Sequence, residues 1–198
     1  MLTFAAAVFF LIITPGPGVL STAGVGSAFG ARPGAWYVLG LFIGTNMVAL
    51  AVVTGIAAVI LADPRIRTVL FVASTAYLLY LALRIAMAGS RIAFIEARRP
   101  PGVWNGIALQ MINPKAYAVN TTLFSGFSFL PASLLAETLL KFLIVNAIWI
   151  PIHFLWLAMG IRLRQLDLSP GVHRMINVGM SLSMLAVVGL AVATFLWS

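Results

Sequence analysis

The sequence predicts an all-α integral membrane protein with six transmembrane helices, arranged as two inverted three-helix repeats with broken helices at TPGP and NPK. Three observations lead to this prediction: a composition too apolar for a water-facing surface, six long apolar runs, and proline breaks at matching places in the two halves. We expect residues 1–198 to form one transmembrane domain. Its repeats cover about 1–88 and 104–198, and a cytoplasmic loop covers about 89–103.

The composition excludes a water-soluble domain. Of 198 residues, 62% are hydrophobic and 8% are charged, whereas soluble domains carry about 25% charged residues. Four acidic and twelve basic side chains cannot cover a surface in water, so the chain belongs in a membrane. The net charge of +8 then reports topology and does not indicate a nucleic-acid partner. Because the chain has no cysteine, disulfides and cysteine metal sites are excluded.

The six apolar runs are each long enough to cross a bilayer core, which needs roughly 20 residues. The separators between them carry nearly all the charge. By pattern the first run is not a cleaved signal peptide, because the first basic residue is Arg32. The runs cover about 4–28, 35–61, 68–88, 104–128, 133–159 and 175–197.

The basic residues favour one orientation. The second loop holds only Arg65 and Arg67. Lys141 lies inside the fifth run and is not counted. Because basic loops stay in the cytoplasm, we expect the odd-numbered loops to be cytoplasmic and both termini to face away from it. These odd-numbered loops hold Arg32, Arg91, Arg98, Arg99, Arg162, Arg164 and Arg174.

Proline breaks recur in the two halves. Pro15 lies 31 residues before Asn46, and Pro114 lies 32 residues before Asn146. If each half is a three-helix unit, the odd number of spans inverts the second unit in the membrane. Inverted repeats with broken helices are typical of secondary transporters. A chance match between two apolar segments is the competing interpretation.

A helix break inside lipid must have its backbone groups satisfied by protein, water or ligand. The break therefore lines a cavity or packs tightly against its neighbours. A half-helix presents N–H groups and a partial positive charge at its start, and carbonyl groups at its end. A zwitterionic amino acid fits such a pair of ends. The alternative is a kinked helix without a ligand, since prolines are common in membrane spans.

Polar residues follow one face of the fourth run and either line a substrate path or hydrogen-bond neighbouring helices. They are Gln110, Asn113, Tyr117 and Asn120. Lys115 lies near the middle of this run, where a charge costs about 2.5 kcal/mol or more. It is therefore a candidate to bind a substrate carboxylate. The alternative is that it caps carbonyl groups freed by the break.

The fifth run carries Asn146 and His153 on one face. Histidine titrates near neutrality, so His153 is a candidate proton relay, although an interfacial histidine with a satisfied hydrogen bond is the favoured interpretation. Glu137 and Lys141 have the spacing of an ion pair near the outer end, and proton transfer is the alternative role. Trp149 and Trp156 are expected in packing or at the interface.

Small residues at Gly40 and Gly44 permit close helix contact, either within the bundle or with another copy of the chain. The sequence does not indicate an enzyme, because it has neither paired carboxylates inside the membrane runs nor an HExxH motif. We predict no cofactor and no metal. The expected partners are a small-molecule substrate and membrane lipid, with a homo-oligomer as a candidate.

The predicted site combines the two breaks with the polar residues that follow them. Candidates for a proton relay are Lys115, His153 and Glu137. The alternative function is a membrane-embedded binding or assembly subunit without transport. The predicted substrate-binding residues are Thr14, Pro15, Gly16, Pro17, Asn46, Asn113, Pro114, Lys115, Asn120 and Asn146.

Three motifs in this order carry a family resemblance: TPGP at 14–17, AYLLYL at 76–81 and NPKA at 113–116. With them the chain resembles the lysine-exporter (LysE/RhtB-type) family of bacterial amino-acid efflux proteins. The resemblance implies a six-helix inner-membrane exporter, built from two inverted repeats and driven by the proton gradient. Many members look acidic where this chain has Asn46. This departure favours a neutral amino acid over lysine or arginine, and it argues against proton coupling at that position.

Overall fold

A computed structural model describes residues 1–57 and 100–166, together with scattered positions between 63 and 79 and between 169 and 189. The continuous stretches contain helices and no strands. The predicted third and sixth runs, 68–88 and 175–197, lie outside these stretches. The helices are α1 (Leu2–Ile13), α2 (Pro17–Phe29), α3 (Ala31–Val53), α6 (Val103–Ile112), α7 (Pro114–Ser125) and α8 (Leu134–Gln165).

Helices α3 and α8 are long and apolar enough to cross a membrane. Helices α1 and α2 meet at an angle of 53° and make a third such segment if the bent pair counts as one span. Helices α6 and α7 follow each other with a break at Asn113. An all-helical, apolar architecture is thereby confirmed, while the six spans and the inverted repeat stay predictions.

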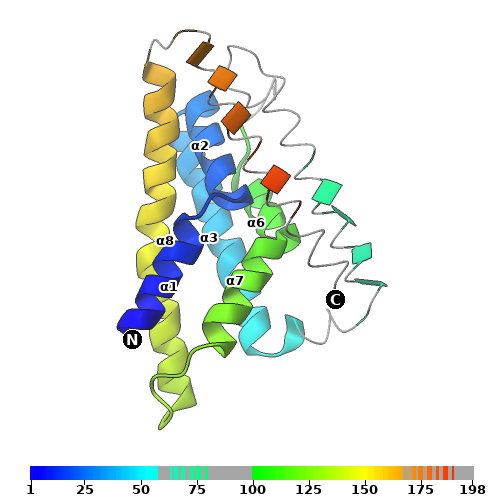
Figure 1. Cartoon of the computed structure of the whole chain (residues 1–198), viewed down its shortest axis with the longest axis vertical. Coiled ribbons are helices and arrows are strands. Elements are labelled where there is room, and N and C mark those ends of the chain that lie inside the picture. Colours follow the sequence, from blue (N-terminus) through cyan, green and yellow to red (C-terminus); the bar gives the residue numbers. More distant parts are fainter. Residues whose placement is uncertain are drawn as a thin grey trace.

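The helices run between two ends of an elongated bundle (Figure 1). The N terminus and the α7–α8 connection lie at one end, and the α2–α3 junction and the C-terminal end of α8 lie at the other. Helices α1, α2 and α8 therefore run in one direction, and α3, α6 and α7 run in the opposite direction. The chain reverses direction between α2 and α3 and again between α7 and α8. At both places the sequence predicts that one span ends and the next begins.

Glycines bring α3 and α6 into close contact. A Cβ atom on Gly40 would collide with the backbone of Val103, and one on Gly106 would lie 2.5 Å from the Tyr37 carbonyl oxygen. A Cβ atom on Gly44 would lie 2.8 Å from the Cβ atom of Gln110. The pair Gly40 and Gly44 thus packs helices within one chain, which decides between the two interpretations of this motif.

A second close contact joins α2 to α8. A Cβ atom on Gly26 would lie 2.7 Å from the Leu157 carbonyl oxygen, and one on Gly160 would collide with the Ala23 carbonyl group. Aromatic and aliphatic side chains such as Phe4 fill the core between the helices. Many large apolar side chains face outward instead, which suits a surface in contact with lipid.

Three helix boundaries differ from the sequence prediction. Helix α3 ends at Val53 and not near residue 61, because Gly55 adopts a left-handed φ of 77° that ends the helix. Only Gly30 separates α2 from α3; Arg32 and Pro33 lie in the first turn of α3, where proline is tolerated. Helix α8 continues to Gln165, beyond the predicted end at 159.

Candidate functional site

The first break separates α1 from α2 at residues 14–16. The Thr14 hydroxyl group donates back to the Phe10 carbonyl oxygen, which closes the end of α1. Gly16 precedes α2 in an extended conformation, and Pro17 opens the helix at a position that needs no N–H donor. No side chain caps the start of α2. Its first N–H groups are therefore left for a ligand or water.

The second break, at Asn113, is closed by side chains of its own. The Asn113 Oδ1 atom accepts a hydrogen bond of 3.1 Å from the backbone N–H of Lys115, which caps the start of α7. The Tyr117 hydroxyl group donates to the Met111 carbonyl oxygen at 3.0 Å, which satisfies the end of α6. Tyr117 therefore satisfies a backbone group at the break and does not line the cavity described below.

The two breaks lie against each other. The Lys115 Nζ atom donates to the Thr14 carbonyl oxygen at 2.6 Å, across the gap between α7 and the end of α1. A Cβ atom on Gly16 would lie 2.8 Å from the Cδ atom of Lys115. Lys115 therefore caps a carbonyl group freed by the other break, which is a form of the alternative role considered for it. One bond leaves two of the three ammonium N–H groups for other acceptors, so capping does not exclude ligand binding.

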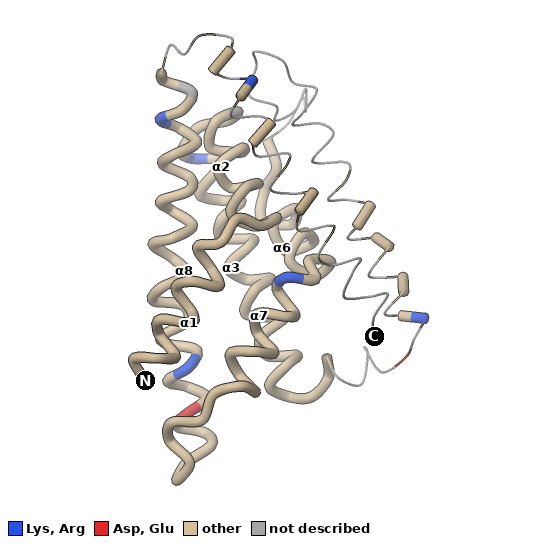
Figure 2. The backbone as a smooth tube through the Cα atoms, in the orientation of Figure 1, with Lys and Arg blue, Asp and Glu red and all other residues tan. Residues whose placement is uncertain are grey.

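In the tube view, the charged residues of the described helices lie toward the two ends of the bundle, with one exception on α7 (Figure 2). Lys115 is the basic residue of α7. Lys141, two turns into α8, is paired with Glu137. Among the described residues, no carboxylate pairs with Lys115. The meeting point of the breaks therefore holds a lone cation.

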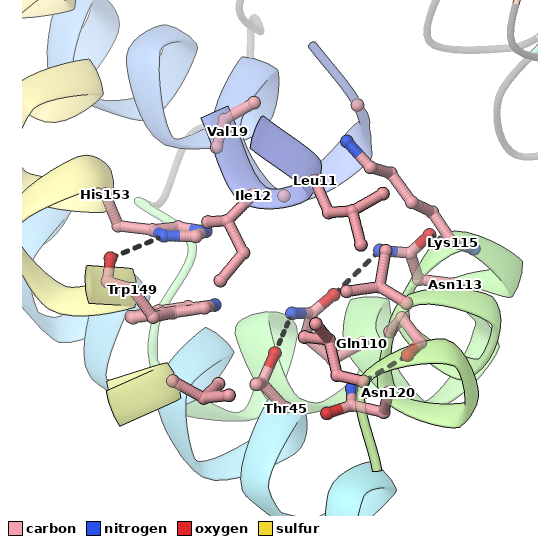
Figure 3. A pocket seen from close by; sticks show the side chains of 16 residues that line it. Leu11, Ile12, Val19, Thr45, Gln110, Asn113, Lys115, Asn120, Trp149 and His153 are labelled. Atoms are coloured by element: carbon pink, nitrogen blue, oxygen red, sulfur yellow. Dashed lines mark hydrogen bonds between the residues drawn. The ribbon is translucent and has the colours of Figure 1, made fainter. Parts of the chain in front are cut away.

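A chain of oriented hydrogen bonds starts at the second break. The Asn113 Nδ2 atom donates to the Gln110 Oε1 atom at 2.8 Å, and the Gln110 Nε2 atom donates to the Thr45 hydroxyl oxygen. A backbone N–H can only donate, so the bond from Lys115 N–H to Asn113 Oδ1 fixes which way the Asn113 amide faces. That orientation in turn fixes the amide of Gln110. Figure 3 shows this chain along one wall of a cavity.

The cavity has a volume of about 60 Å³ and lies between the two breaks and α8. That volume has room for a few water molecules. Apolar side chains such as Leu11 and Val19 make up most of its wall, and a small set of polar side chains projects among them (Figure 3). Such a combination is typical of small-molecule sites. The polar members are Thr45, Gln110, Asn113, Lys115, Asn120 and His153.

His153 lies in the interior of the bundle. Its side chain is 3% exposed and lines the cavity. The ring stacks on Trp149 with centroids 3.5 Å apart, and its Nδ1 atom lies 3.0 Å from the Trp149 carbonyl oxygen. The hydrogen bond expected for His153 is present, and the ring lies inside the bundle and not on its outer surface. Helix α8 continues through Pro151 to Gln165.

Two of the predicted site residues bind each other. The Asn46 Nδ2 atom donates to Asn146 Oδ1 at 3.1 Å, and the Asn146 Nδ2 atom donates to Asn46 Oδ1 at 2.9 Å. This reciprocal pair joins α3 to α8 outside the cavity lining. Of the other predicted residues, Gly16, Asn113, Lys115 and Asn120 line the cavity. Thr14, Pro15, Pro17 and Pro114 form the breaks without lining it.

Sequence reasoning left several cavity residues out of the site. Gln110 was visible in the polar face of the fourth run but was not selected. Thr45 lies between Gly44 and Asn46, and a polar residue inside an apolar run was the available signal. Gly18 also lines the cavity but gave no signal in the sequence, because its place there depends on how closely α8 approaches it.

Glu137 and Lys141 form the predicted ion pair, with a distance of 2.8 Å, and both side chains are buried. The Glu137 Oε2 atom accepts from the backbone N–H groups of Phe129 and Leu130 at 3.0 and 2.6 Å. Lys141 donates to the carbonyl oxygen of Phe124. The pair therefore ties the α7–α8 connection to α8, away from the cavity lining. The role of Glu137 in a proton relay stays a prediction.

Broken apolar helices around a small cavity with a few polar side chains are typical of membrane transporters. A family model described as LysE type translocator matches residues 9–197, so the chain belongs to the LysE type translocator family. The resemblance seen in the sequence is thereby confirmed. Membership implies an efflux transporter of amino acids or similar solutes, and not an enzyme. No curated protein and no solved structure matches the chain.

Proposed function

We propose that this protein exports a neutral amino acid, or a similar small zwitterion, across the bacterial inner membrane by proton-driven alternating access. The observation that carries the proposal is the position of Lys115. Its ammonium group lies where the two helix breaks meet, beside a cavity, with two N–H groups left for a ligand.

A substrate carboxylate would bind between Lys115 and the start of α2. The start of a helix carries a partial positive charge and free N–H groups, and that of α2 has no side-chain cap. The start of α7 is already capped by Asn113. The lack of a side chain at Gly16 lets the Lys115 side chain pack directly against the start of α2. These features favour α2 over α7 as the anion site.

A neutral side chain on the substrate is favoured by the charges around the cavity. No carboxylate lines it among the described residues, so the side chain of a lysine or arginine substrate would lack a counter-ion inside the membrane. Glu137 is already paired with Lys141. Lys115 and His153 are the titratable groups at the cavity that could follow a proton gradient.

The pairing of equivalent positions supports two inverted repeats. In a bundle with a two-fold pseudo-axis in the membrane plane, equivalent residues near the axis contact each other. Asn46 and Asn146 match in the sequence pattern and bind each other. The break at Pro15 and the break at Pro114 match as well, and Thr14 and Lys115 join them. Rocking one repeat against the other about this axis would open the cavity to alternate sides.

The test uses cells that overproduce the protein and are challenged with toxic concentrations of neutral amino acids or their analogues. The parent protein should confer tolerance, and Lys115→Met should abolish it without lowering the amount of protein in the membrane. Lys141→Met is the contrast, because breaking a buried ion pair should lower the amount of folded protein. If Lys115→Met conferred full tolerance, Lys115 would be structural and the carboxylate site would be wrong.

A further inference from the structure

The ring of His153 has a defined hydrogen-bonding state. Its Nδ1 atom faces the Trp149 carbonyl oxygen at 3.0 Å. A carbonyl oxygen only accepts, so Nδ1 carries the proton and Nε2 of the neutral ring is an acceptor. The side chain is 3% exposed, and no described group forms a hydrogen bond with Nε2. A buried acceptor without a donor lines the cavity.

A second acceptor faces the same space. A Cβ atom on Gly18 would lie 3.5 Å from His153 Nε2 and 3.9 Å from Gln110 Oε1. The hydrogen bond from Asn113 identifies that Gln110 atom as the oxygen and uses one of its two lone pairs. Figure 3 shows both side chains at the cavity, one from α8 and one from α6. The Gln110 Nε2 atom would lie 4.0 Å from the same Cβ atom, but it donates to the Thr45 hydroxyl oxygen. Two acceptors and one donor with a partner therefore border the space beside Gly18.

We propose that His153 Nε2 and Gln110 Oε1 form a binding site beside Gly18 for the ammonium group of the substrate. The inference rests on the proposed export of an amino acid, and it adds a binding site for the second charged group of that substrate. The carboxylate site lies beside Gly16, and two residues of chain span at most about 7 Å. That separation suits the two charged groups of one α-amino acid. Neutral acceptors recognise a primary ammonium group by its three donors.

The glycine at position 18 is informative because the fold does not require it. The nearest atom to an added Cβ would be at 3.5 Å, an ordinary contact distance. Alanine also forms helices better than glycine, by about 1 kcal/mol. Gly18→Ala should therefore fold, while its methyl group fills the proposed ammonium site. This variant separates a role in binding from a role in folding.

The experiment measures counterflow in liposomes containing purified protein. Glycine, L-alanine, L-threonine and L-leucine are tested first as substrates. Counterflow of the best substrate is then measured with either of two unlabelled competitors. One is the same amino acid, and the other is its matched acid lacking the amino group, such as propionate for alanine. In His153→Leu and Gly18→Ala, the amino acid should compete about tenfold or more weakly, as expected for a lost hydrogen bond to a charged group. Competition by the matched acid should stay unchanged. His153→Gln keeps an acceptor and should recover part of the affinity.

Two substitutions serve as controls. Phe154→Leu changes the adjacent, 45% exposed residue of α8, and Gly102→Ala adds a Cβ atom in open space. Both should match the parent. If His153→Leu and Gly18→Ala weakened the amino acid and its matched acid equally, or weakened neither, the ammonium site would be wrong. If the parent transported none of the four amino acids, the proposed function itself would fail.

Discussion

The contact between Gly16 and Lys115 shows how one residue without a side chain positions another. A Cβ atom at residue 16 would lie 2.8 Å from Cδ and 3.1 Å from Nζ of Lys115. Gly16 has an extended φ of −170°, which any residue adopts. Gly16→Ala should therefore displace the flexible lysine side chain without straining the backbone. We expect a severalfold higher KM for export and an unchanged melting temperature. A large loss of stability with normal export would contradict this assignment.

Tyr117 tests the distinction between a residue of the break and a residue of the substrate path. Its hydroxyl group satisfies the Met111 carbonyl oxygen at 3.0 Å. Tyr117→Phe should lower the free energy of unfolding by about 1 kcal/mol and leave the affinity for substrate unchanged. Unfolding in detergent and counterflow measure the two quantities. Reduced affinity at unchanged stability would place Tyr117 in the path after all.

At the scale of helices, the sequence predicted the breaks because proline and glycine act locally on the backbone. It could not predict which polar side chains meet, because that depends on the register between helices far apart in sequence. Asn46 and Asn146 were selected as ligands, but they bind each other. The apolar run also continues past Val53, so hydropathy hid the helix end that Gly55 imposes. The burial of His153 could not be predicted for the same reason, since burial is a property of the assembled bundle.

The asparagine pair lends itself to a double-mutant cycle. Asn46→Leu and Asn146→Leu should each destabilise the bundle, because each leaves one half-buried amide without its partner. The double variant should lose less than the sum of the two. We expect a coupling free energy of about 1 kcal/mol from unfolding in detergent. Additive losses would show that the two amides do not interact in the membrane.

The close contact of α3 with α6 gives a further prediction. Gly40→Ala should destabilise the protein by about 1–3 kcal/mol, because the added Cβ atom meets the backbone of Val103 and not a movable side chain. Gly102→Ala, in open space, is the matched control. Thermal unfolding of both variants in the same detergent makes the comparison. Equal melting temperatures would mean that the two helices pack less closely than described.

For the whole molecule, the arrangement of the bundle ends predicts accessibility from opposite sides of the membrane. Ala31 lies at the α2–α3 junction and Ala132 in the α7–α8 connection, at opposite ends of the bundle (Figure 1). The chain has no cysteine, so Ala31→Cys and Ala132→Cys each introduce a single thiol. The basic loops predict labelling of Ala31→Cys from the cytoplasm and of Ala132→Cys from outside. Labelling of both from one side would overturn this topology.

Export by way of Lys115 is the central claim, and efflux from liposomes tests it most directly. Liposomes containing purified protein are loaded with labelled L-alanine, L-threonine, L-leucine or L-lysine, and a proton gradient is imposed. We predict faster efflux of at least one neutral amino acid than from empty liposomes, no such increase for L-lysine, and loss of efflux in Lys115→Met. Binding of an amino acid without efflux of any would contradict the claim and indicate a binding or assembly subunit.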